Sequence, residues 1–181
     1  MPHRRILAID PDEEIIFEIT RHPIGWMFIL WTGILINALI LFGIIFVALN
    51  GELLEEFQRP AIFLLLGMML LAALITYIGV MIYRNNRLTV TSQNLVQQLQ
   101  HSLVNRKISQ LSLAKIQDVS VEQRGILATV FNYGKIDIET AGEEANFAFE
   151  FAVNPYENAK FIIEAHEQFI KSQMGQLQQD F

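Results

Sequence analysis

The hydrophobic and polar positions of this chain divide it into two parts. Residues 24–49 and 61–83 form two long apolar stretches without a charged side chain, and shorter alternating segments follow from residue 84 onward. At about 1.5 Å per residue, each stretch makes a helix longer than the roughly 30 Å hydrocarbon core of a bilayer. The pattern therefore predicts a transmembrane hairpin over residues 24–83, with a short external loop at 50–60, and a separate domain after it.

In most segments after residue 84, apolar and polar side chains alternate with a period of two, as they do in strands with one buried face. Strands are expected at residues 88–91, 95–100, 106–112, 116–122, 135–140 and 146–152. The period then changes, because Asn154 suits a helix N-cap, Pro155 suits the first helical position, and apolar residues recur at helical spacing up to Ile170. This order predicts an α+β fold, an antiparallel roll or partly open barrel capped by a C-terminal helix.

Three shorter segments have less decisive patterns. Residues 14–21 also alternate, so they form either an edge strand of the domain's sheet or an interfacial segment before the first helix. Residues 125–132 carry several apolar side chains and are expected to form a short packed helix, while the Gln-rich residues 173–181 are expected to fray. The predicted organisation is therefore an N-terminal segment 1–23, the hairpin, a domain over 84–172 and a frayed tail.

The positively charged residues predict the orientation of the hairpin. Arg21 precedes the first helix and Arg84 and Arg87 follow the second, whereas the connecting loop has one Arg beside three Glu. Because Lys and Arg near the ends of spans favour the cytoplasmic side, we expect both termini in the cytoplasm and two spans in the inner or plasma membrane. The expected membrane-interface anchors are Arg21, His22, Trp26 and Tyr83.

One polar residue, Asn37, lies near the middle of the first apolar stretch. In a transport path it would be a polar site, but neither stretch contains an acid or a base that could relay a proton or bind an ion. We therefore expect Asn37 to make an interhelical hydrogen bond, the usual role of an isolated amide inside a membrane.

Composition and charge exclude several classes of function. The net charge is −6, and from residue 84 onward nine Lys and Arg stand against eleven Asp and Glu, a net charge of −2 without a basic stripe, which argues against nucleic-acid binding. The absence of cysteine excludes disulfide scaffolds, thiolate zinc sites and thiol nucleophiles. The four His residues are far apart, and no phosphate-binding loop or nucleophile motif is present, so we expect no metal, no cofactor, no small-molecule substrate and no enzymatic activity.

Three segments of the domain carry a family resemblance. They are residues 87–96 (RLTVTSQNLV), 113–121 (LAKIQDVSV) and 132–142 (NYGKIDIETAG). Together they resemble the bacterial membrane-flanked pleckstrin-homology-like (PH-like) domain proteins of the YdbS type, in which a helical hairpin runs directly into a PH-like domain. The resemblance implies about seven strands and one helix and implies no catalytic activity. Asn94 departs from the family pattern, which often has Arg at this position.

These observations leave three hypotheses about function. The first is a membrane-anchored interaction or scaffold protein, whose partners are the lipid bilayer and either another protein or a second copy of the chain. The second is weak recognition of anionic lipid heads, for which the candidate contacts are Arg84, Arg87, Arg106 and Lys107. The third is a subunit of a membrane transport or envelope complex. Because the four cations are spread over a domain with a net charge of −2, we expect little preference among lipid head groups.

Overall fold

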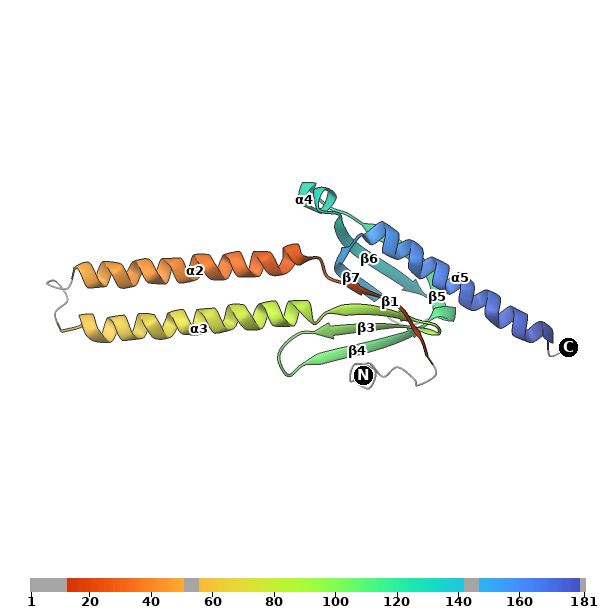
Figure 1. Cartoon of the computed structure of the whole chain (residues 1–181), viewed down its shortest axis with the longest axis horizontal. Coiled ribbons are helices and arrows are strands. Elements are labelled where there is room, and N and C mark those ends of the chain that lie inside the picture. Colours follow the sequence, from red (N-terminus) through yellow and green to blue (C-terminus); the bar gives the residue numbers. More distant parts are fainter. Residues whose placement is uncertain (1–12, 51–55, 142–146, 180–181) are drawn as a thin grey trace. The chain divides into compact units, whose positions relative to one another are not determined.

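The chain folds as two units, which the computed structural model describes over residues 13–50, 56–141 and 147–179. One unit is the hairpin, residues 23–83, and the other is the domain that is built from the residues on both sides of it. Figure 1 shows the elements of both units in chain order. Parts of the predicted N-terminal segment 1–23, of the loop 50–60 and of the tail 173–181 lie outside the described residues.

The hairpin consists of α2 (Pro23–Leu49) and α3 (Gln58–Arg84), which begin and end within three residues of the predicted stretches. Both helices are long and apolar enough to cross a membrane. Most of their large apolar side chains are exposed, as Leu39 and Phe42 on α2 and Leu70 on α3 illustrate. A continuous apolar surface of this kind is rare on soluble monomers and is typical of helices that face lipid.

Glycine allows the two helices of the hairpin to approach each other closely. Gly25 and Gly33 lie two turns apart on one face of α2 and are both buried. A Cβ atom at Gly25 would overlap the Tyr83 ring, and a Cβ at Gly33 would overlap the Thr76 side chain. Small residues at the contact are the usual means by which membrane helices pack, because lipid gives them no hydrophobic driving force to associate.

The domain contains two antiparallel sheets, as predicted for a PH-like roll. The first sheet has the order β1-β2-β3-β4 and the second has the order β5-β6-β7. The strands are β1 (Ile15–Thr20), β2 (Arg87–Thr91), β3 (Asn94–Gln100), β4 (Arg106–Ser112), β5 (Ile116–Glu122), β6 (Tyr133–Thr140) and β7 (Phe147–Val153). The predicted α+β fold of seven strands with a C-terminal helix is confirmed.

Three helical segments connect and cover the sheets. The 3-10 turn η2 (Leu113–Lys115) joins the two sheets, α4 (Ile126–Val130) lies between β5 and β6, and α5 (Pro155–Gln179) packs on β5, β6 and η2. The helix α5 contributes Ile162 and Ala165 to the core and is fixed to η2 by His166, whose Nδ1 lies 2.7 Å from the Leu113 carbonyl oxygen.

The strand β1 decides between the two alternatives for residues 14–21. It pairs with β2 in antiparallel register, with Thr20 opposite Arg87, and Arg21 then forms a bridge with Ala152 of β7. The segment before the first helix is therefore a strand that connects the two sheets. Its Ile19 side chain is fully buried in the core between them.

Two predicted features of the domain were wrong in extent. The segment 125–132 forms the expected short helix, but the helix does not pack: Ile126 is 82% exposed, Val130 is 70% exposed and only Ala128 is buried. A helix of five residues can turn only one short face towards the domain, so the apolar side chains on its other faces stay exposed. The helix α5 continues to Gln179, so residues 173–179, which were expected to fray, are helical, because Gln, Met and Leu favour helix and no Pro interrupts the segment.

We predict that the domain needs residues 13–22 to fold. A fragment of residues 84–181 should lack a cooperative melt, and the same fragment with 13–22 joined to it by a Gly/Ser linker should regain one. In the joined fragment, Ile19→Ala should cost about 2–5 kcal/mol of unfolding free energy, since it empties a buried site. The matched control Ile16→Ala, at a half-exposed position, should stay within about 0.5 kcal/mol. A cooperative melt of residues 84–181 alone would contradict the prediction.

Candidate functional site

A groove between the edge strand β5 and helix α5 is the candidate site for a partner. Its volume is 560 Å³. Its apolar lining comes from Val119 and Val121 on β5 and from Tyr156, Ala159 and Ile163 on α5. Ile163 belongs to the apolar stripe that the sequence places in the core, yet it is 41% exposed and lines the groove. The groove is therefore a partly apolar surface that the rest of the domain leaves open.

One edge of β5 has no neighbouring strand among the residues that the structure describes, because β5 is the outermost strand of its sheet. On this strand the main-chain N–H of Val119 donates to Oδ1 of the adjacent Asp118 at 2.9 Å. An edge strand of this kind can accept an added strand through its main-chain groups.

Three charged residues of α5, Lys160, Glu164 and Glu167, also line the groove. Lys160 lies 3.6 Å from Glu164, and Glu167 lies 3.4 Å from Lys171, each pair one helical turn apart. All four side chains are largely exposed, and exposed pairs at this spacing contribute little to stability. They can exchange these partners for charges on a bound segment at small cost.

The four cations predicted to contact anionic lipid do not converge on a pocket. Arg87 is paired with Glu18 of β1 at 2.8 Å, and Arg106 donates to the Gln98 side chain at 2.5 Å. Lys107 is exposed next to Arg106 on β4, and Arg84 is exposed at the end of α3. Since Arg87 is already neutralised, the arrangement lacks the cluster of cations that selective binding of a phosphorylated head group requires.

Arg21 and His22, predicted as membrane anchors, are held by aromatic residues of the domain. The Arg21 guanidinium lies over the Phe149 ring at 5.9 Å, and the His22 ring stacks on Tyr133 at 5.4 Å. Tyr133 in turn stacks on Phe151, whose carbonyl oxygen accepts the His22 N–H at 2.6 Å. These aromatic partners could not be predicted, because they come from strands far from His22 in sequence.

Burial lowers the pKa of His22 below its ordinary value of about 6.5. The physical cause is the loss of hydration, which disfavours the charged imidazolium. His22 therefore favours its neutral form in the folded domain.

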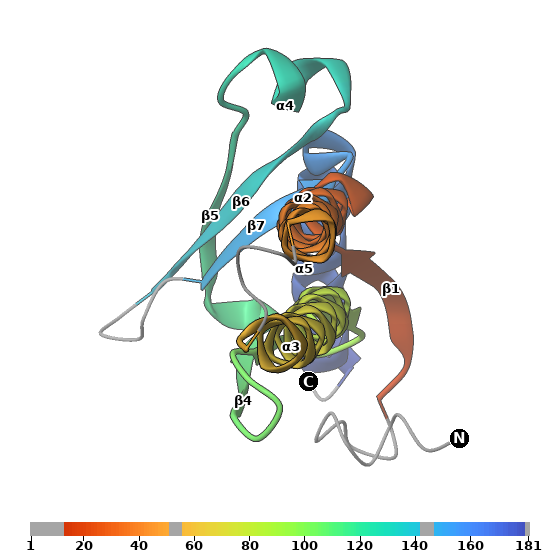
Figure 2. The same cartoon turned by 90° about the vertical axis from the view of Figure 1, so that its left-hand side faces the viewer.

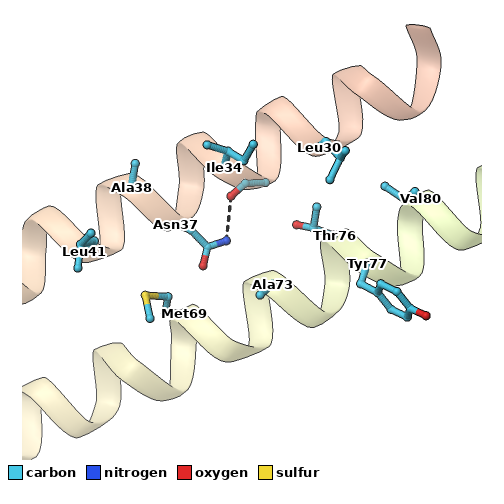
Figure 3. Close-up of a pocket in the computed structure, with 11 residues that line it drawn as sticks. Leu30, Ile34, Asn37, Ala38, Leu41, Met69, Ala73, Thr76, Tyr77 and Val80 are labelled. Atoms are coloured by element: carbon cyan, nitrogen blue, oxygen red, sulfur yellow. Dashed lines mark hydrogen bonds between the residues drawn. The ribbon is translucent and has the colours of Figure 1, made fainter. Parts of the chain in front are cut away.

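The remaining predicted residues lie in the hairpin. Trp26 is half-buried and Tyr83 is buried against Gly25. Asn37 faces a 550 Å³ apolar cavity between α2 and α3 (Figure 3), but its amide donates to the Gly33 carbonyl oxygen of its own helix at 2.8 Å. This bond stays within α2, because the amide reaches the carbonyl one turn back in its own helix, and an interhelical bond of Asn37 stays a prediction.

A buried carboxylate at the first hairpin of the domain was missed by sequence reasoning. Glu13 is almost fully buried, and its side chain accepts hydrogen bonds from the Thr91 hydroxyl and from the Asn94 amide. Asn94, the residue that departs from the family pattern, therefore helps to satisfy this carboxylate. The contacts fix the turn between β2 and β3.

The described residues contain no group of three or more His, Asp or Glu side chains that could hold a metal ion. Asp137, which shares a strand with Glu139, is paired with Lys135 at 2.7 Å.

A family model and a solved structure relate the chain to known proteins. Residues 27–165, from within α2 to within α5, match the family model described as "Bacterial PH domain". Among solved structures, the chain is similar to a DUF1696 family protein with a pleckstrin-homology domain from Shewanella loihica PV-4. The two are 16% identical, with a TM-score of 0.35, over 45% of this chain and 70% of that one. No curated protein matches the chain.

We predict that His22 makes the stability of the domain depend on pH. Because the pKa is lower in the folded state, the unfolded state takes up the proton first as the pH falls below about 6.5. The contribution of His22 is therefore complete above that pH and is lost as the pH falls towards the folded pKa. The urea midpoint of the detergent-solubilised chain should fall between pH 7.5 and pH 5.5 by more than that of His22→Phe, which keeps an aromatic ring and cannot titrate. Equal slopes for the two proteins would rule out this role.

Proposed function

Because this chain belongs to the bacterial PH domain family, we propose that it is a membrane-anchored docking module that binds an extended segment of a partner protein in the groove between β5 and α5. The proposal includes no catalytic step. The PH-like relationship predicted from the sequence is confirmed, and the narrower YdbS type stays a prediction.

The strand pairing supports anchoring by a two-span hairpin. The helices α2 and α3 are long and apolar enough to span a bilayer, and β1 precedes the first while β2 follows the second. The pairing of β1 with β2 supports a topology in which the two outer ends of the hairpin emerge on the same side. We propose that this side is the cytoplasm, because Arg21 and Arg84 flank these ends.

The observation that carries the docking function is the open edge of β5 beside an apolar groove. Added strands obtain affinity from main-chain hydrogen bonds and specificity from every second side chain, which enters a pocket. Here the edge of β5 would supply the bonds and the surface around Val121 and Ile163 would accept the side chains. The partner segment should therefore be extended, with apolar and polar residues in alternation.

The positions of the cations support selective lipid binding less well than the groove supports protein docking. Two of the four candidate side chains contact neighbours within the domain, Arg87 with Glu18 and Arg106 with Gln98. The remaining cations can add a non-selective attraction of about 1 kcal/mol each near an anionic leaflet. We therefore propose protein binding as the function and a general attraction to lipid as its accompaniment.

The first prediction of the proposal concerns topology. Because the chain has no cysteine, a single cysteine can be introduced at Glu56 in the loop or at Gln93 in the domain. In intact cells an impermeant maleimide should label the cysteine at 56 and should label the one at 93 only after lysis. The opposite pattern would place the domain outside the cytoplasm.

The second prediction concerns the groove. A photo-crosslinking amino acid in place of Tyr156, which lines the groove, should form a defined protein adduct in cells of the native host. Ile163→Asp should abolish this adduct, because a carboxylate would face the apolar chain of the partner. Met174→Asp is the matched control on an exposed part of the same helix and should leave the adduct intact. Both positions are exposed, so both variants should fold with stability changes within about 0.5 kcal/mol. An adduct that survives Ile163→Asp would contradict docking in the groove.

A further inference from the structure

The domain has two exposed apolar tips that its fold does not use. The first is α4, where Ile126 and Val130 are largely exposed. The second is the loop between β3 and β4, where Leu103 is 53% exposed and Val104 is 97% exposed. Neither tip lines the groove between β5 and α5. Large apolar side chains that gather at exposed tips are a recognised mark of an interaction surface.

The strand registers place both tips at one end of the domain. Thr20 pairs with Arg87, Arg87 pairs with Gln98 near the end of β3, and Tyr133 of β6 pairs with Val153. The loop after β3 and the helix before β6 therefore leave the sheets in the same direction, as Figure 1 shows. Figure 2, which looks at this end, shows α4 and the loop that leads into β4 at opposite edges of the domain.

The same end of the domain holds the two points at which the chain continues into α2 and α3. The residue before α2, His22, stacks on Tyr133, which follows α4 closely in sequence. After α3, Asn85 donates to the Gln100 side chain at 2.9 Å, and Asn86 accepts the Gln100 N–H at 2.5 Å. The α4 tip is thus close to the connection into α2, and the β3–β4 loop is close to the connection out of α3. Each tip lies within a few residues of where a membrane span would start or end.

We infer that this end of the domain lies in the interfacial layer of the bilayer, with the two apolar tips inserted among the lipid head groups and upper acyl chains. Interfacial elements typically bury their apolar residues about 5–10 Å into this layer and keep cations at its surface. Lys107 lies near the first tip and Arg124 near the second; both are exposed and meet this requirement, although Arg124 also pairs with Glu122.

The test uses single-cysteine variants of the full-length chain in phosphatidylcholine/phosphatidylglycerol liposomes. Cysteines replace Val104 or Ile126 at the tips and are labelled with the fluorophore NBD. In the two controls the labelled cysteine replaces Gln93 or Met174. Gln93 lies at the end of β3 opposite to the Val104 loop, about 20 Å along the strand, and Met174 is an apolar residue that is 55% exposed near the far end of α5. Each label is quenched separately by iodide in the buffer and by doxyl groups on the lipid.

We expect the labels at 104 and 126 to be quenched by doxyl lipid and to show a several-fold smaller iodide quenching constant than the labels at 93 and 174. Iodide quenching at the tips as strong as at the controls would overturn the inference, because the tips would then lie in water. Protection from iodide without quenching by doxyl lipid would overturn it as well, since protein rather than lipid would then cover the tips. Neither result depends on whether the groove binds a partner.

Discussion

The pairing of β1 with β2 is the interaction on which the rest of the structure depends. It joins the residues before the hairpin to the residues after it, and the bridge from Arg21 to Ala152 extends the contact to the second sheet. Ile19 enters the core from this strand, and Glu18 pairs with Arg87 across it. Without β1 the two sheets would expose their core and two unpaired strand edges. The fold of the domain and its attachment to the helices therefore both depend on the pairing of β1 with β2.

The sequence predicts those parts of the fold in which local pattern and burial agree. Alternation located six of the seven strands, and the Asn154-Pro155 signal located the start of α5. It left β1 undecided, because its partners lie on the far side of the hairpin in sequence. It was wrong about the packing of α4, since Ile126 and Val130 have the composition of a core but no neighbours to cover them. Periodicity shows which residues share a face and does not show what covers that face.

The candidate site was less predictable than the fold for the same reason. The groove depends on how far α5 stands from β5, and nothing in the sequence of either element distinguishes Ile163, which lines the groove, from Ile162, which is buried one residue earlier. Arg84 and Arg87, which were named from the sequence, lie at and just after the end of α3, but the pairing of Arg87 with Glu18 depends on β1, whose position the sequence left undecided. Local signals thus identify charges, and only the three-dimensional structure shows which charges remain available.

The position of the hairpin between β1 and β2 has a consequence for how the protein is made. During synthesis β1 is complete long before β2, and it must wait for both helices before its partner exists. If α2 and α3 span a bilayer, the two strands meet only when both helices have been inserted, since one missing span would leave them on opposite sides. A chain inserted in the wrong topology cannot close its sheets and would present unpaired strand edges to quality-control proteases. If the helices span a bilayer, closure of the split domain therefore requires that both have been inserted first.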